Sequence, residues 1–445
     1  MVQDTDSLPT AIDVDRSHGR MSFRWVICLL LFLATTINYM DRQVLGLLAP
    51  FLEKAIGWNE LQYGHIVVAF QAAYAIGQLG FGWLIDRWGT KKGYALAMVA
   101  WCVAAAGHGL AGSVTGFMTA RFALGLGEAG NFPAAIKAVS EWFPKRERAL
   151  ATGLFNSGST VGAILAPFAV SAISAAYGWQ AAFVALGAIG LLWLLLWLLL
   201  YDRPEDSPRV TEAELAHIRS DDHAGLSDVG NVAARTSSVN WGRLLTLRQT
   251  WAYSIQALCV QPIWWFYLFW LPKFFHSRFG LELQKSAPLL AVTYAMSMVG
   301  SISAGALSAW LLKRGWSVNA ARKIALLVCA LVTVPMVEVT RVNNAWTATL
   351  LIGLALGGMQ GWSANAYTIV SDLFPKGAVA SIVGLGSACG SAVAMLLALL
   401  VGAVLQRSGS YHIPFFIAGV SLPVAIMLVH LMVPRWDPVE LNGLE

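Results

Sequence analysis

Twelve long apolar runs make up most of this chain, and each is about 20 residues or longer. A helix of that length crosses the roughly 30 Å hydrocarbon core of a bilayer, whereas an open sheet exposed to lipid would leave its backbone polar groups unpaired. The sequence therefore predicts an all-α membrane protein. The predicted spans cover residues 23–49, 60–85, 92–112, 114–140, 148–174, 178–201, 249–272, 285–312, 321–340, 345–371, 378–405 and 411–434.

Lys and Arg residues fall mainly on one side of the predicted spans. With the N-terminal tail inside, inner segments hold 21 of the 30 Lys and Arg residues, outer segments hold 6, and 3 lie within spans. Because basic residues are enriched in the cytoplasmic loops of membrane proteins, we expect both termini to be cytoplasmic. This topology accounts for the net charge of +5 without nucleic acid as a partner. The first run is too long for a cleaved signal peptide and is expected to remain as a span.

The sequence divides into two related halves. Residues 140–145 read SEWFPK, and residues 371–376 read SDLFPK at an offset of 231, which places the fifth span on the eleventh. Repeats of this kind are typical of transporters, whose substrate sites lie at the repeat interface near the membrane midplane. The predicted organisation is an N-terminal tail at 1–22, a six-helix bundle at 23–201, a polar cytoplasmic linker at 202–248, a second bundle at 249–434 and a C-terminal tail at 435–445.

Four charged residues lie well inside apolar spans of the first half, namely Asp41, Arg42, Arg121 and Glu128, whereas Lys137 lies near the inner end of its span. A charge at the bilayer centre costs at least about 2.5 kcal/mol, so it is normally paired, faces a protein cavity and marks an ion or substrate path. Arg121 and Glu128 are seven residues apart and share a helix face. We expect Asp41 to pair with Arg121, Arg42 to be free to bind a carboxylate through two parallel hydrogen bonds, and Glu128 to carry a proton. The alternative is a structural ion network.

Polar side chains on the second span form a further candidate group. Gln71, Tyr74 and Gln78 recur three and four residues apart and would form one stripe. Such groups suit the hydroxyls of a sugar, but they could equally bond to a neighbouring helix. Tyr39 lies beside the charged pair on the first span and fits the same site.

In the second half the candidates are aromatic and polar side chains. Trp264, Trp265, Tyr267 and Trp270 could stack on a sugar ring or belong to an interfacial aromatic belt, and Trp264 is taken as the site residue. Ser363 and Asn365 are two residues apart and cannot both point the same way on a helix. The candidates of this half are Trp264, Gln360, Ser363 and Asn365.

The loop between the second and third spans reads GWLIDRWGTKK over residues 82–92. It resembles the G-x-x-x-D-R-x-G-x-K-K signature of the major facilitator superfamily, although an ordinary basic inner loop would share some of its features. The resemblance implies twelve helices in two pseudo-symmetric bundles. It also implies conformational gating by Gly82, Asp86, Arg87 and Gly89, with a close helix approach at Gly82.

Other segments resemble the anion:cation symporter branch of that superfamily, and two resemble its bacterial hexuronate transporters in particular. The resemblance implies that Asp41 and Glu128, with Arg121, take part in proton coupling and that Arg42 binds the anion. One departure is Gln261, where those transporters usually have Asp before the proline. The segments are residues 38–42 (NYMDR), 128–133 (EAGNFP) and 140–148 (SEWFPKRER) for the branch. For the hexuronate transporters they are residues 262–273 (PIWWFYLFWLPK), and 360–365 (QGWSAN) followed by 371–375 (SDLFP).

These observations predict a proton-coupled symporter that imports a hexuronate, such as glucuronate or galacturonate, across a bacterial inner membrane. Its partners would be the sugar-acid anion, protons and the lipid bilayer, and it would act as a monomer without a cofactor or metal. Importers of an aldonate or aldarate, or an uncoupled facilitator, remain alternatives. A membrane enzyme or sensor is a remote one, because the eight histidines are scattered and the linker is short for a folded domain.

Overall fold

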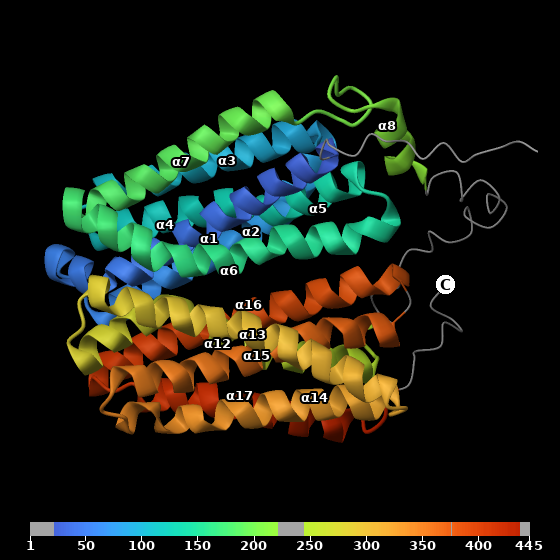
Figure 1. Cartoon of the computed structure of the whole chain (residues 1–445). Coiled ribbons are helices and arrows are strands. Elements are labelled where there is room, and N and C mark those ends of the chain that lie inside the picture. Colours follow the sequence, from blue (N-terminus) through green and yellow to red (C-terminus); the bar gives the residue numbers. More distant parts are fainter. Residues whose placement is uncertain (1–21, 221–243, 375, 437–445) are drawn as a thin grey trace, which may run out of the picture.

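The computed structural model describes residues 22–220, 244–374 and 376–436 (Figure 1). Two bundles of long helices lie side by side, with the N-terminal half of the chain in one and the C-terminal half in the other. Most of the predicted tails and residues 221–243 of the predicted linker lie outside the described residues. The end of the bundles at which the short helix α8 (Glu212–Ile218) lies is called the linker end, and the opposite end is called the far end.

Each predicted span coincides with one long helix or, at the fourth span, with a pair of shorter ones. The first bundle contains α1 (Phe23–Ile56), α2 (Glu60–Trp88), α3 (Thr90–Gly107) with the 3-10 turn η1 (His108–Leu110), α4 (Val114–Glu128), α5 (Asn131–Trp142), α6 (Lys145–Tyr177) and α7 (Trp179–Leu200). The second contains α12 (Arg248–Phe279), α13 (Leu283–Lys313), α14 (Val318–Thr333) with the 3-10 turn η3 (Val334–Arg341), α15 (Ala345–Leu373), α16 (Lys376–Ser408) and α17 (His412–Met432).

The fourth span is broken, where the sequence predicts one continuous helix. α4 ends at Glu128 and α5 begins at Asn131. Pro133 explains the break, because it has no N–H to donate to the carbonyl of Ala129 and its ring crowds that carbonyl. The break leaves Glu128 as the last residue of its helix.

The internal repeat is visible in how helices pack. α2 meets α4 at Gly125, where an added Cβ would lie 2.5 Å from the carbonyl oxygen of Phe70. The equivalent helices of the second half, α13 and α15, meet at Gly300, where an added Cβ would lie 2.3 Å from the Cα of Gly357. Small residues that let two backbones approach closely are typical of helix packing in membranes, and here both halves use them between their second and fourth spans.

The two bundles are in close contact at the far end. An added Cβ at Gly46 of α1 would lie 2.9 Å from the carbonyl oxygen of Leu268, and one at Gly64 of α2 would lie 3.1 Å from that of Ala398. Toward the linker end, a Cβ at Gly82 or Gly305 would meet no atom of the described residues within 4 Å. The close approaches at Gly46 and Gly64 show that the helices of the two halves are packed tightly at the far end.

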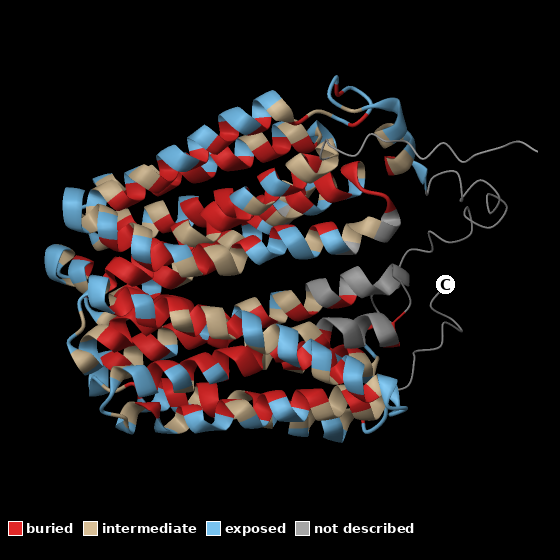
Figure 2. Cartoon of the chain, in the orientation of Figure 1, coloured by how far each residue is buried: buried red, intermediate tan, exposed pale blue. Residues whose placement is uncertain are grey.

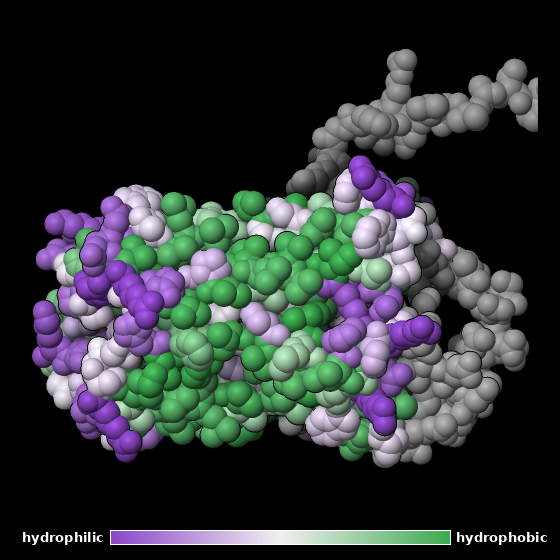
Figure 3. Space-filling model, turned by 90° about the horizontal axis from the view of Figure 1, so that it is seen from below, coloured by the Kyte–Doolittle hydropathy of each residue, from purple (hydrophilic) through white to green (hydrophobic). Residues whose placement is uncertain are grey.

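The outer surface of the bundles suits a lipid environment. Buried residues lie mainly where helices face one another (Figure 2), and apolar side chains form a band between the two polar ends (Figure 3). Within the described part of the chain, nine helices are long and apolar enough to cross a membrane. Exposed apolar side chains also occur on α7 of the first bundle, where Leu192 and Leu199 are 61% and 66% exposed.

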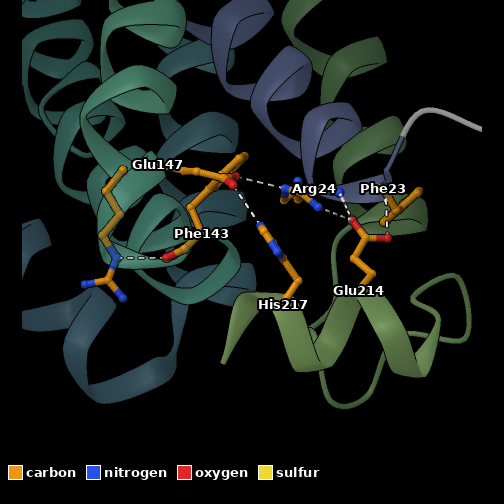
Figure 4. A network of polar contacts seen from close by, with 7 residues as sticks. Phe23, Arg24, Phe143, Glu147, Glu214 and His217 are labelled. Atoms are coloured by element: carbon orange, nitrogen blue, oxygen red, sulfur yellow. Dashed lines mark hydrogen bonds and ion pairs between the residues drawn. The ribbon is translucent and has the colours of Figure 1, made fainter. Parts of the chain in front are cut away.

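Helix α8 ties together the beginnings of α1 and α6 at the linker end (Figure 4). The Glu214 carboxylate accepts hydrogen bonds from the backbone N–H groups of Phe23 (3.1 Å) and Arg24 (3.0 Å), whereas Ser22 offers no side-chain cap. Glu147 on α6 accepts from Arg24 Nε at 3.2 Å and from His217 Nε2 at 2.7 Å. The first turn of α1 is therefore capped by a carboxylate from a distant part of the chain.

The network predicts an acid-dependent stability contribution from Glu147. Partial burial opposes the shift, but the hydrogen bond from His217 and the charge of Arg24 lower the pKa of Glu147 below its ordinary value of 4.5. A carboxylate with a lowered folded-state pKa stabilises the protein above about pH 4.5, and this contribution is lost as the pH falls through the folded-state value. We expect Glu147→Gln to cost about 1.5–3 kcal/mol at neutral pH and progressively less below pH 4.5.

The measurement is the thermal midpoint of the purified protein and its variant between about pH 3 and pH 8. Glu205→Gln is the matched control, because Glu205 pairs with Arg219 and both side chains are 45% exposed. An exposed pair contributes about 0–1 kcal/mol. A constant difference between Glu147→Gln and wild type across the pH range would contradict the prediction.

Candidate functional site

The four charged residues of the first bundle meet between α1 and α4. Asp41, Arg42, Arg121 and Glu128 are 3%, 2%, 0% and 0% exposed. α1 supplies the first two and α4 the other two, with Glu128 directly before the break. Such burial requires that each charge find its partners within the protein.

The ion pair of this site joins Arg42 to Glu128. The Nε atom of Arg42 lies 2.7 Å from Oε2 of Glu128. The expectation that Arg42 is free and that Asp41 pairs with Arg121 is therefore wrong. Asp41 and Arg121 lie at similar depth, counted in residues from the helix ends, but depth does not decide which side chains meet. Successive residues of a helix point about 100° apart, and it is Arg42 that faces Glu128.

The Arg42–Glu128 pair leaves hydrogen-bonding capacity on both sides. Nη2 of Arg42 and Oε1 of Glu128 are buried and have no hydrogen-bond partner among the described residues. A guanidinium and a carboxylate can form two parallel hydrogen bonds, and a single bond is seen here. Arg42 therefore retains a buried donor that a second carboxylate could use.

Asp41 faces α3 instead of α4. Its Oδ2 atom accepts a hydrogen bond of 2.6 Å from the indole Nε1 of Trp101, a side chain with no exposed surface. A tryptophan in an apolar span has no feature that marks it as a site residue, so sequence reasoning missed Trp101. The indole fixes one carboxylate oxygen of Asp41 in place.

Arg121 lies close to the pair without bonding to either acid. Its Nη1 atom is 3.5 Å from the carbonyl oxygen of Arg42, and its guanidinium lies 5.8 Å from the ring centre of Phe70. Its Nε and Nη2 atoms have no hydrogen-bond partner in the described part of the chain. Two arginines thus share a buried site with two acids, and only one of the four possible ion pairs between them forms.

Four aromatic rings surround the Arg42 guanidinium, and we call them the aromatic cage. The distances from the guanidinium carbon to the ring centres are 4.5 Å for Tyr74, 4.9 Å for Tyr39, 5.5 Å for Trp265 and 5.6 Å for Phe70. Within about 6 Å a ring face attracts a cation electrostatically. Because Trp265 belongs to α12, the cage is built from both bundles.

Of the predicted residues, Tyr39 and Tyr74 belong to this cage, whereas Trp264 does not. Trp264 packs edge-on against Tyr294, with ring centres 6.5 Å apart. Its neighbour Trp265 occupies the position at Arg42, since adjacent helix residues point in different directions. A run of consecutive aromatic residues does not reveal which one faces the site.

The predicted glutamines of α2 differ in environment. Gln71 is 3% exposed, and neither its amide nitrogen nor its amide oxygen has a hydrogen-bond partner among the described residues. Gln78 is exposed. Gln71 therefore offers a buried amide within one helical turn of Tyr74.

The predicted polar residues of α15 bond mainly to their own helix. Ser363 Oγ donates to the carbonyl oxygen of Met359 at 3.1 Å, and Asn365 Nδ2 donates to that of Gly361 at 3.0 Å. Asn365 also accepts from Arg322 of α14 at 3.5 Å. Gln360 is partly buried. Gln261 of α12 donates to Ser391 Oγ at 3.1 Å, so it joins α12 to α16.

The predicted gating loop joins α2 to α3. Gly89 has a φ of 83°, a backbone conformation that favours glycine, and it lies between the two helices. Arg87 is exposed, with its guanidinium 5.3 Å from the ring of Trp83. Among the described residues, none makes the close helix approach expected at Gly82. The side chain of Asp86 lies outside the described residues.

Comparisons with known proteins agree on one family. The family model of the Major Facilitator Superfamily matches residues 31–396. A hexuronate transporter of Escherichia coli (strain K12) is 32% identical over 390 residues, which cover 87% of this chain and 88% of that protein. A probable galactarate/D-glucarate transporter of Bacillus subtilis (strain 168) is 30% identical over 93% of this chain and 92% of its own. The crystal structure of a D-xylose-proton symporter superposes with a TM-score of 0.73 at 15% identity, covering 94% and 100% of the two chains.

The contact between Trp101 and Asp41 can be tested by a double-mutant cycle. We expect Trp101→Phe to lower the free energy of unfolding by more than the smaller buried ring alone would cost, because it leaves a buried carboxylate oxygen without its donor. In an Asp41→Asn background the same substitution should cost less. The expected coupling energy is about 1.5–3 kcal/mol, measured from chemical denaturation in detergent micelles. Additive effects of the two substitutions would show that the hydrogen bond contributes nothing to stability.

Proposed function

Since this chain belongs to the Major Facilitator Superfamily and is a membrane transporter rather than an enzyme, we propose that it imports a hexuronate together with a proton. Glucuronate and galacturonate are the proposed substrates. The observation that carries the proposal is the buried Arg42–Glu128 ion pair inside the aromatic cage. The hexuronate transporter of Escherichia coli and the probable galactarate/D-glucarate transporter of Bacillus subtilis support the class of substrate.

In the proposed binding step, the carboxylate of the substrate takes the place of Glu128 at Arg42. Arg42 already holds one carboxylate through a single hydrogen bond and has a further buried donor in Nη2. A planar guanidinium can bind an incoming carboxylate through two parallel bonds, which an ammonium group cannot do. The hydroxyls of Tyr39 and Tyr74 and the amide of Gln71 would then meet the hydroxyls of the sugar, and the indole of Trp265 would cover one face of its ring.

The proposed coupling follows from the same exchange. Once the substrate occupies Arg42, Glu128 loses its partner in a buried site, where an unpaired carboxylate is costly. A proton taken up by Glu128 removes that cost, so anion and proton enter together. Asp41 is the second proton-carrying acid of the proposal, held by Trp101, and Arg121 keeps a positive charge beside both.

The proposed orientation places the linker end in the cytoplasm of a bacterial cell, with both termini inside. The positive-inside distribution of Lys and Arg supports it. The close contact of the bundles at the far end then corresponds to an inward-facing state of a monomeric transporter. Alternating access would consist of rocking the bundles about the site that Arg42 and Trp265 share.

Import of an aldarate is a second candidate function. The Bacillus subtilis relative, a probable galactarate/D-glucarate transporter, favours it. An aldarate has two carboxylates, and Arg121 would be a second cation within the site, because its Nε and Nη2 atoms have no hydrogen-bond partner among the described residues. A larger rise in the thermal midpoint with galactarate than with glucuronate would favour this candidate.

A ligand panel tests the proposed substrate class. We expect glucuronate or galacturonate to raise the thermal midpoint of the purified protein, whereas glucose, which lacks the carboxylate, should not. Gluconate and galactarate represent the aldonate and aldarate alternatives. Arg42→Lys should weaken binding of the stabilising ligand by roughly 10- to 150-fold, equivalent to about 1.5–3 kcal/mol for a hydrogen bond to a charged group. Stabilisation by glucose at the same concentration, or unchanged affinity in Arg42→Lys, would contradict the proposal.

Glu128→Gln should separate proton coupling from translocation. Glutamine keeps the size of a protonated glutamate but cannot release a proton. We expect the variant to lose accumulation driven by a pH gradient in proteoliposomes while it still exchanges internal for external substrate. The two assays use the same vesicles, so the exchange assay is the control for folding and insertion. If the variant still concentrates substrate in response to the gradient, Glu128 is not the coupling site and Asp41 carries that role alone.

A further inference from the structure

Besides Arg42 and Arg121, a third buried cation lies at the far end, on the boundary between the two bundles. Lys273 of α12 is 4% exposed, and its Nζ atom lies 2.7 Å from Glu60 Oε1 and 2.9 Å from Glu53 Oε2. Both acids belong to the first bundle and Lys273 to the second. Each ion pair therefore connects the two halves of the protein.

The local structure holds both acids toward this lysine. α1 ends at Ile56, Gly57 turns the chain with a φ of 78°, and Asn59 caps the start of α2. Glu53 and Glu60 therefore flank one tight turn. Next to them, the hydroxyl of Tyr63 donates a hydrogen bond of 2.7 Å to the carbonyl oxygen of Phe269, one turn before Lys273.

A cavity of about 340 Å³ adjoins the three charged side chains. This volume lies within the range of small-molecule sites. Its lining is rich in ionisable groups, because Lys54 and His276 face it together with Glu53, Glu60 and Lys273. A cavity of this size and charge lies on the boundary along which the bundles would separate.

We propose that Lys273 is an entry site for the carboxylate of the transported anion, occupied by Glu53 and Glu60 whenever the far end is closed. Separation of the bundles at this end removes both acidic partners from Lys273 at once, because both move with the first bundle. A nearly buried cation left without a partner is costly, and an arriving organic carboxylate replaces the lost pair. The inference rests on the proposed transport of an organic anion.

The entry site repeats the chemistry of Arg42 at a different depth. In both places a buried cation holds a carboxylate of the protein that a carboxylate of the substrate can replace. Lys273 follows Trp265 by eight residues on the same helix, which corresponds to about 12 Å along the axis. An anion released by Lys273 would therefore be close to the aromatic cage.

Uptake and efflux of labelled glucuronate in proteoliposomes of known orientation test this role. We expect Lys273→Gln to raise the KM for entry from the far end at least tenfold, with a smaller change in the KM for exit. Lys273→Arg should stay near the wild-type KM. Lys285→Gln is the matched control, since it removes one exposed positive charge from the same end and should leave both KM values unchanged.

The double variant Glu53→Gln with Glu60→Gln distinguishes an entry site from a latch, by which we mean that the ion pairs of Lys273 only hold the far end closed. It breaks both cross-bundle ion pairs but keeps Lys273, so spin labels at the exposed residues Ala55 and Gln284 should move apart while the entry KM stays the same or falls. An entry KM that rises equally in this variant and in Lys273→Gln would reduce Lys273 to a latch. An unchanged entry KM in Lys273→Gln would also overturn the inference. Failure of the wild type to transport any sugar acid would overturn the proposed function. This outcome is recognised from the wild type alone, whereas the entry-site inference is decided by the variants of a protein that does transport.

Discussion

The cost of removing an ionic group from water is the constraint on which this site depends. Arg42 and Glu128 lie at 2% and 0% exposure inside a bundle whose outer face is apolar, so neither could be tolerated without the other or a substitute. That requirement explains why Arg42 is paired with Glu128 and why aromatic rings surround its guanidinium. In the proposed transport cycle, a carboxylate of the substrate meets the same requirement when it takes the place of Glu128.

The two halves of the chain share their helix packing but not the charged residues of the site. Both halves pack their second span against their fourth through glycine, at Gly125 and at Gly300. The four charges of the site, by contrast, occur only in the first half. The offset of 231 places Ile352 and Met359, which are buried and apolar, at the positions of Arg121 and Glu128. The second half contributes an aromatic side chain, Trp265, to the cage. Helix packing follows the repeat, whereas the four charges of this site belong to one bundle and the other bundle completes their surroundings.

The sequence predicts the helices and the four buried charges because both depend on hydropathy alone. It does not predict which charges pair, because this depends on helix rotation, and a difference of one residue turns Arg42 toward Glu128 and Asp41 toward Trp101. The same limitation explains the choice of Trp264 over Trp265. The break after Glu128 could have been anticipated from Pro133, since proline disturbs the hydrogen bond to the preceding turn. The close approach expected at Gly82 depends on a neighbouring helix, which local sequence does not describe.

The position of Trp265 in the cage has a thermodynamic consequence for the protein as a whole. Its indole lies 5.5 Å from the guanidinium carbon of Arg42, although the two residues belong to different bundles. Occupancy of Arg42 and the relative placement of the bundles are therefore linked equilibria. A ligand that binds more tightly when the indole is in place favours that placement, and by reciprocity the placement strengthens the ligand by the same factor. Even substitutions remote from the ligand, if they alter how α1 and α12 approach each other, would then change its affinity.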